Sequence, residues 1–246
     1  MATPDAAVTL ARLLRERLGE SVVALELMAG IGMDFLAATL PDVPKPPVTG
    51  GWLVLVEAAG GETVGEALEA VLADAFERDL LGDAAIAQSE SQRAAFWRIR
   101  EDLPDANRRI GAVSSHDIAV PLGALPDFIA AADDAVQRMA PELRVNCFGH
   151  LGDGNMHYNV FPPEGVSAKA YRDRAESVMA AVHDVVHAHG GSISAEHGIG
   201  RLKVDELERY GDPGKLHAMR LIKAALDPLG VLNPGAVLRP RPSPPT

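Results

Sequence analysis

The sequence predicts an α+β fold in which helices cover one large sheet, either antiparallel or mixed. Short runs of β-branched or alternating residues repeatedly give way to longer stretches of helical period, a pattern typical of strands followed by helices. Both halves of the chain show this order of elements, so we expect a duplicated ferredoxin-like β-α-β sandwich with a C-terminal helical segment. The length of 246 residues and the apolar fraction of 47% allow a hydrophobic core and exclude a disordered chain.

Each predicted strand in the first half is followed by a predicted helix. Before them, residues 1–20 place charged and apolar residues at helical spacing and are expected to form a linker helix. Gly30 and Gly32 are expected to make the turn after the first strand. The expected strands are residues 21–28, 52–58 and 84–88, and the expected helices are residues 30–40, 62–78 and 91–103.

The second half repeats this order and adds a hairpin at a glycine-rich turn. A long helix is expected to stop at Gly190 and Gly191, because glycine suits the left-handed conformation of a helix cap. The proline-rich residues 239–246 are expected to form a disordered tail. The expected strands are residues 116–122, 143–150, 156–161 and 191–194, and the expected helices are residues 124–140 and 167–191.

Composition excludes several classes of function. The 34 acidic and 23 basic residues give a net charge of −11, which repels nucleic acids and anionic lipid headgroups. No apolar run approaches the roughly 20 residues of a transmembrane helix, and the first residues do not resemble a secretion signal. The single cysteine, Cys147, cannot form an internal disulfide. We therefore expect a cytoplasmic protein, with attachment to a membrane only through partners.

Polar residues are unusually dense in the segment GHLGDGNMHYN, residues 149–159. The two-residue period of a strand predicts that His157 and Asn159 point to the same face, and His150 can approach them across the glycine-rich turn. One interpretation is a single convergent polar site. The other is an ordinary tight hairpin, whose Asp153 and Asn155 bond their own backbone and whose histidines are exposed.

A second polar segment, SISAEHGIGR, follows a short predicted strand and contains Glu196 and His197. Two imidazoles and one carboxylate with an open coordination position are the ligand set of a catalytic zinc ion. His150, His157 and Glu196 are therefore candidate metal ligands, although Glu196 as a local ion-pair partner is an open alternative. Four other histidines lack a glycine-rich setting: His183, His187, His189 and His217. The first three of these are expected on a solvated helix face.

Together with the run LDPLGVLNPGAVL at residues 226–238, these two segments resemble the C-terminal half of the FAD-linked oxidases. That family includes D-2-hydroxyglutarate dehydrogenase, D-lactate dehydrogenases and one of the subunits of glycolate oxidase. The likeness extends over residues 21–238 and includes the runs FWRIRE and DIAVPL. It implies a substrate-binding, or cap, domain of a flavoprotein that oxidises a D-2-hydroxy acid such as lactate, glycolate or 2-hydroxyglutarate to the 2-oxo acid.

The resemblance also implies a role for each candidate residue. FAD would accept a hydride, and a divalent metal, zinc with manganese or iron as alternatives, would bind the substrate. His197 matches the base that removes the hydroxyl proton, a task that suits the pKa of histidine. The implied metal ligands are His150, His157 and Glu196, the implied substrate contacts are Arg100 and Asn159, and the implied cofactor contacts are Asn233 and Gly235.

The sequence departs from the family pattern at two positions. Relatives specific for a dicarboxylate carry a lysine where this chain has Ser115, so either His116 replaces it or the substrate is a monocarboxylate. The motif LNPG usually continues with lysine, but position 236 is alanine, which leaves an ionic contact to the flavin or its domain in doubt.

The glycine-rich domain that binds FAD in these enzymes is absent from this chain, so we expect the chain to need a FAD-binding domain or subunit. The partners expected otherwise are a small 2-hydroxy acid and an unspecified electron acceptor, with a homodimer as an open question. Two other functions stay open: a stand-alone zinc hydrolase that uses the same His/His/Glu ligands, and a non-catalytic partner subunit.

Overall fold

The computed structural model describes residues 1–239, which form two compact units. The first unit comprises Met1–Ser192, and the second begins at Ile193. No helix among the described residues is both long and apolar enough to cross a membrane.

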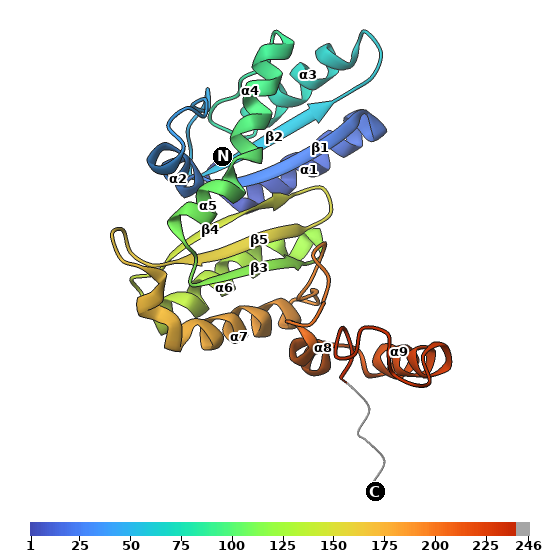
Figure 1. Cartoon of the computed structure of the whole chain (residues 1–246). Coiled ribbons are helices and arrows are strands. Elements are labelled where there is room, and N and C mark those ends of the chain that lie inside the picture. The colour runs from blue at the N-terminus through green and yellow to red at the C-terminus, as the bar shows by residue number, and fades with distance from the viewer. Residues whose placement is uncertain (240–246) are drawn as a thin grey trace, which may run out of the picture. The chain divides into compact units, whose positions relative to one another are not determined.

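The first unit is built on a five-stranded sheet in which every neighbouring pair is antiparallel (Figure 1). The strand order is β2-β1-β4-β5-β3, so β1 pairs with strands from both halves of the chain. The α+β prediction is confirmed, with the antiparallel form of the sheet. The strands are β1 (Val22–Ala29), β2 (Trp52–Ala58), β3 (Ser114–Ala119), β4 (Arg144–His150) and β5 (Asn155–Phe161).

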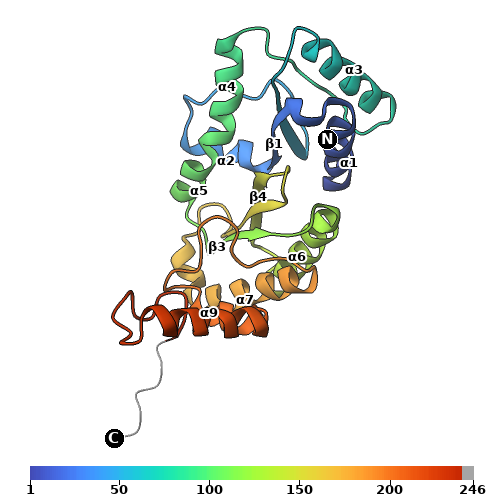
Figure 2. The same cartoon turned by 90° about the vertical axis from the view of Figure 1, so that its right-hand side faces the viewer.

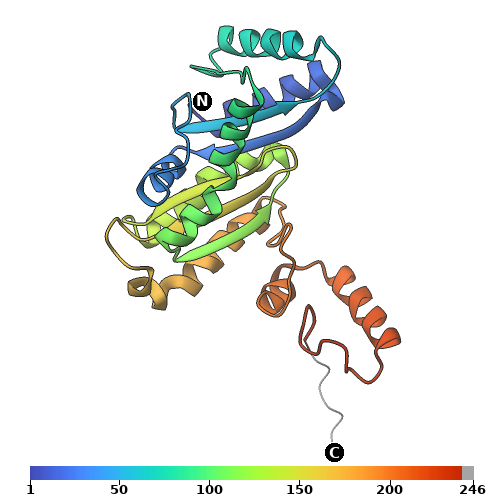
Figure 3. The same cartoon turned by 45° about the horizontal axis from the view of Figure 1, so that its top comes forward.

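Helices cover both faces of this sheet (Figure 2). One face carries α1 (Pro4–Leu18), α3 (Val64–Glu77), α6 (Leu125–Met139) and α7 (Arg172–Ala188). The other face carries α2 (Ile31–Thr39), α4 (Glu90–Glu101) and α5 (Leu103–Ile110). The last two helices lie in front of the sheet in Figure 3, where they are green.

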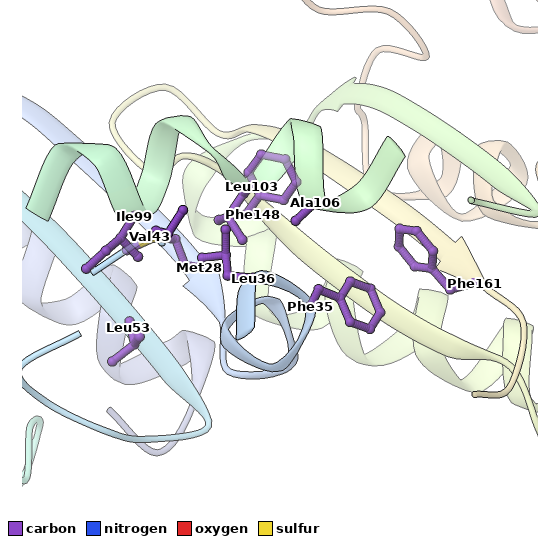
Figure 4. Packing of buried hydrophobic residues seen from close by; sticks show 10 residues of the cluster. All are labelled: Met28, Phe35, Leu36, Val43, Leu53, Ile99, Leu103, Ala106, Phe148 and Phe161. Carbon is purple, nitrogen blue, oxygen red and sulfur yellow. The ribbon is translucent and has the colours of Figure 1, made fainter. Parts of the chain in front are cut away.

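A hydrophobic cluster joins α2, α4 and α5 to this second face of the sheet (Figure 4). The rings of Phe35 in α2 and Phe161 in β5 meet edge to face, with their centroids 4.8 Å apart. This cluster holds the three helices against the sheet and includes the last residue of β5. Its buried members are Met28, Phe35, Leu36, Val43, Leu53, Ile99, Leu103, Ala106, Phe148 and Phe161.

The structure corrects two predictions about elements and adds one helix that the sequence analysis did not predict. Residues 84–88 form no strand, because AAIAQ offers only one β-branched side chain among three alanines. Residues 103–110, which carried no prediction beyond Leu103, form α5, with Pro104 in its first turn, where its missing N–H breaks no helical bond. The short strand expected at 191–194 is reduced to one bridge between Ser192 and Ala119.

The buried Tyr158 and the half-buried Asp133 form a pair on the face covered by α6 and α7. The Tyr158 hydroxyl donates to Oδ1 of Asp133 over 2.6 Å, while burial raises the pKa of Asp133 above its ordinary value. We expect Tyr158→Phe to lower the free energy of unfolding by about 1–3 kcal/mol near pH 7, because Asp133 loses its donor.

This loss is expected to depend on pH. The substitution raises the native-state pKa of Asp133 further. The folded protein then holds the Asp133 proton more tightly than the unfolded chain does. The loss should therefore shrink as the pH falls through that raised pKa towards the ordinary 3.8. Urea denaturation at several pH values measures it, with Tyr171→Phe, which removes an exposed hydrogen bond to Glu142, as the control. A loss that stays constant with pH would contradict this account.

The second unit is helical but has few buried apolar residues. It contains α8 (Val204–Tyr210) and α9 (Pro213–Leu226), which confirms the expected C-terminal helical segment. Asp227 accepts hydrogen bonds from the backbone N–H groups of Val231 and Leu232 and so fixes the turn after α9. The tail expected at 239–246 lies outside the described residues except for Arg239, which donates to Asp205.

Candidate functional site

Polar side chains gather on the sheet face that also carries α4 and α5. Directly opposed residues of antiparallel strands share a face, and Glu26 lies opposite His150, Phe148 opposite His157, and Asn146 opposite Asn159. The ring centroids of His150 and His157 are 6.3 Å apart. The strand register thus brings both histidines and Asn159 to one face, as their spacing in the sequence predicts.

The turn between β4 and β5 is held tightly in place. Gly154 has a φ of +79°, and a Cβ atom there would lie 2.1 Å from the carbonyl oxygen of Val120. Asp153 accepts a hydrogen bond from the backbone N–H of Asn155 over 3.0 Å, as the hairpin interpretation predicts. The turn is therefore a tight hairpin, but its histidines are half-buried on the polar face of the sheet and not exposed, as the hairpin interpretation had expected.

Glu26 is a buried residue of this site that was not among the candidates from sequence. It lies in the middle of β1 and is only 4% exposed. Its Oε1 atom is 2.7 Å from Nδ1 of His150, and its Oε2 atom accepts a hydrogen bond of 2.8 Å from Nε of Arg100. The available signal was a lone carboxylate between Leu25 and Leu27 in an otherwise apolar strand, since buried carboxylates are rarely unpaired.

Arg100 is buried, although its sequence context alone suggested an exposed charge on a helix. It is 7% exposed, and its guanidinium carbon lies 4.8 Å from the ring centroid of Phe148. The ion pair with Glu26 uses Nε, so the two terminal nitrogens are the donors that remain for a carboxylate.

The side chains of Ser115 and His116 belong to opposite faces of β3. Ser115 lies opposite Asn159 and is exposed on the polar face. His116 is 2% exposed and packs on the other face, with its ring centroid 5.0 Å from that of His183 and its Nε2 atom 3.1 Å from the Ser114 hydroxyl. A strand cannot turn one residue alone to its other face, so the idea that His116 replaces the missing lysine is wrong.

The expectation of a solvated face for the three histidines in and directly after α7 is also wrong in part. His183 is 1% exposed, because it lies on the side of α7 that packs on the sheet, together with Val182 and Val186. His187 is exposed, and Nδ1 of the half-buried His189 lies 2.8 Å from the carbonyl oxygen of Val185.

The remaining candidate residues lie in the second unit. Glu196 and His197 are exposed, and a carboxylate oxygen of the first lies 3.9 Å from Nε2 of the second. Asn233 and Gly235 belong to a turn in which the backbone N–H of Ala236 donates to the carbonyl oxygen of Asn233 over 3.1 Å. Their role towards a cofactor stays a prediction.

A cavity of about 830 Å³ lies elsewhere in the first unit, between β2, α4 and residues 83–90. Its lining contains Glu57, Arg93 and Trp97 but none of the candidate site residues. The largest described cavity volume and the polar face of the sheet therefore involve different residues.

Comparison with known proteins identifies the family. The model of the family "FAD linked oxidases, C-terminal domain" matches residues 1–237. The chain belongs to this family. Solved structures show the same fold at low sequence identity: a structure of p-cresol methylhydroxylase with substrate bound matches this FAD-linked oxidase domain with a TM-score of 0.65, 14% identity and 97% coverage of the chain.

Curated relatives of this FAD-linked oxidase domain are named as dehydrogenases of hydroxy acids. The mitochondrial D-2-hydroxyglutarate dehydrogenase of Arabidopsis thaliana is 35% identical over 91% of the chain. The D-2-hydroxyglutarate dehydrogenase of Stutzerimonas stutzeri is 33% identical over 80%, and a putative D-lactate dehydrogenase of Schizosaccharomyces pombe is 31% identical over 74%. The chain spans only 39%, 42% and 36% of these three relatives. A cytoplasmic location stays a prediction, because two of these names include the word mitochondrial.

Proposed function

We propose that the chain is the substrate half of a FAD-dependent enzyme that oxidises a 2-hydroxy acid to the 2-oxo acid. The observation that carries the proposal is the meeting of His150, His157 and Asn159 on one sheet face, next to a buried arginine. Names of relatives with 31–35% identity support the same reaction class. Family membership gives no support to the alternative of a stand-alone zinc hydrolase.

We propose His150, His157 and Glu196 as the ligands of one divalent cation, a group whose composition could hold a metal ion. Nδ1 of His150 faces Glu26, which leaves Nε2 as its ligand atom. Asn155, opposite His150 in the sheet, has a buried Oδ1 atom with no hydrogen-bond partner among the described residues. Neutral nitrogen ligands and a single carboxylate favour zinc, with manganese or iron as alternatives.

When bound, the cation would lower the pKa of the substrate hydroxyl, and FAD would accept the hydrogen of C2 together with the two electrons of the broken C–H bond, as a hydride. Residues of the chain would bind the substrate and accept its hydroxyl proton. The terminal nitrogens of Arg100 would hold the substrate carboxylate, and Asn159 would add a polar contact. A ring nitrogen of His197 would accept the hydroxyl proton, while Asn233 and Gly235 would lie at the edge of the cofactor.

The substrate class that we propose is a monocarboxylic 2-hydroxy acid such as lactate or glycolate. Ser115 offers a small neutral hydroxyl where dicarboxylate-specific relatives carry a lysine, and His116 faces the other side of the sheet. No cation of β3 therefore points to the polar face, since Ser115 and Asp117 are its polar side chains there. The names of the curated relatives favour the dicarboxylate 2-hydroxyglutarate instead. Measuring which acid the enzyme oxidises therefore distinguishes the two substrate classes.

A dye-reduction assay tests the proposal. The chain is combined with a FAD-binding domain or subunit and assayed with the D-forms of lactate, malate and 2-hydroxyglutarate, and with glycolate. We expect reduction with a monocarboxylate, and we expect Ser115→Lys to raise kcat/KM for 2-hydroxyglutarate relative to lactate by about 10- to 150-fold, the equivalent of one charged hydrogen bond. Ser177→Lys, at an exposed position of α7, is the control. No reduction of any of the four acids would refute the proposed function.

A further inference from the structure

We propose that Glu26 is a positioning residue that orients both His150 and Arg100, and thereby couples the metal site to the substrate carboxylate site. The inference rests on the proposed function, because it concerns the same site. Glu26, Arg100 and His150 come from β1, α4 and β4, so only the folded chain brings them together.

The geometry assigns a separate partner to each oxygen of the Glu26 carboxylate. Oε1 lies 2.7 Å from Nδ1 of His150, and Oε2 lies 2.8 Å from Nε of Arg100. Glu26 and His150 are directly opposed in the sheet, so their distance is fixed by the backbone pairing. The Glu26 side chain is 6% exposed and that of Arg100 is 8% exposed, which protects the contact between them from competing water.

A carboxylate at Nδ1 determines which nitrogen of His150 carries the proton. The carboxylate can only accept, so Nδ1 must donate, and the lone pair of the neutral ring is then on Nε2. Nε2 is the ring nitrogen that does not face Glu26. Such a partner both selects the tautomer that binds metal and fixes the plane of the ring.

The second oxygen fixes the plane of the Arg100 guanidinium. Its Nε edge is bound to Glu26, and its central carbon lies over the ring of Phe148, 4.8 Å from the centroid. Two contacts of different direction leave the fork of terminal nitrogens in one orientation, which is what a bidentate carboxylate contact requires.

A buried ion pair that only stabilised the fold would make the same contacts. The test therefore needs a measurement that reports the state of the His150 ring and not only protein stability. In Glu26→Gln, the amide oxygen can still accept from Arg100, but the amide nitrogen would donate to Nδ1 of His150. The proton of the neutral ring would then move to Nε2, the atom that has to bind the metal. The substitution preserves side-chain size and inverts the tautomer.

The experiment uses the full chain. Nitrogen-15 NMR of histidine in the metal-free protein assigns the tautomer of His150, and titration with Zn²⁺ alone gives its Kd. We expect an Nδ1-protonated ring in the original protein and an Nε2-protonated ring in Glu26→Gln, together with an increase in Kd of about 10- to 100-fold. The matched control is Glu57→Gln, because Glu57 also lies in the sheet and pairs with an arginine of α4, Arg93, outside the proposed site.

An unchanged tautomer, or an equal increase in Kd for both variants, would overturn the inference. If Glu26→Gln does not fold, an Nε2-protonated His150 in the original protein would overturn it, and an Nδ1-protonated ring would support it. The tautomer is measured without metal, flavin or substrate. A protein that fails the dye-reduction assay but shows the expected tautomers would refute the proposed function, while the orientation of the His150 ring by Glu26 would still stand.

Discussion

Replacing Arg100 by methionine is expected to lower the free energy of unfolding by about 3–5 kcal/mol, the usual consequence of leaving one partner of a buried ion pair uncompensated. Glu26 would lose its cation at a position where its side chain is only 6% exposed. Methionine keeps an unbranched apolar side chain at this position, so loss of volume contributes little. Denaturation in urea, followed by circular dichroism, measures the change.

The double variant Glu26→Gln with Arg100→Met separates charge from packing. Removing both charges should recover at least half of the loss, because no charge then lacks its counter-ion. Arg93→Met is the control: Arg93 also belongs to α4 and also pairs with a glutamate of the sheet, but its side chain is 49% exposed, so the denaturation midpoint should hardly move. If Arg100→Met and Arg93→Met lowered the free energy of unfolding by similar amounts, burial of the Glu26–Arg100 pair would not explain the loss.

Removing the metal is expected to reduce the activity of the FAD-loaded enzyme by about 1,000-fold or more, since several kcal/mol of transition-state stabilisation would be lost. Treatment with a chelator should produce this loss, and added Zn²⁺ should reverse it. His157→Ala should produce the same loss without recovery, because the open coordination site would lack one of its three protein ligands.

Two measurements make this second prediction specific. Metal analysis of the purified protein should give about one divalent ion per chain, falling in His157→Ala and unchanged in His217→Ala, which alters an exposed histidine of α9. Turnover is measured by dye reduction with the best substrate. An enzyme that retains full turnover after complete removal of the metal would refute metal assistance while leaving flavin-dependent oxidation possible by another route.

Local sequence predicted most of the strands and helices. The strand at Trp52–Ala58 matches its predicted range, and the strand at Asn155–Phe161 begins one residue earlier than predicted. These segments carry strong apolar or alternating patterns, which short-range sterics and burial favour in one conformation. The failures lie where the pattern is weak, as in residues 84–88, or where a second helix with a proline in its first turn follows closely after another helix, as at Pro104.

The site was only partly predictable, because burial depends on partners that are distant in the sequence. His157 and Asn159 were assigned to one face from a two-residue period, which is a local property. Arg100 gave no local sign of burial, and Glu26 lies 74 residues from Arg100 and 124 from His150. No periodicity within β1, α4 or β4 records those pairings.

The amino-acid order alone determined that this is an α+β chain of the FAD-linked oxidase type, with histidines at a glycine-rich hairpin. Backbone sterics, side-chain period and ordered motifs act over a few residues, so they can be deduced without coordinates. The tertiary structure decided that a carboxylate of β1 is shared by a guanidinium and an imidazole, and that His116 faces away from the polar side. Those outcomes depend on the order in which the strands pair. This pairing buries charged side chains, which then require partners that are distant in the sequence.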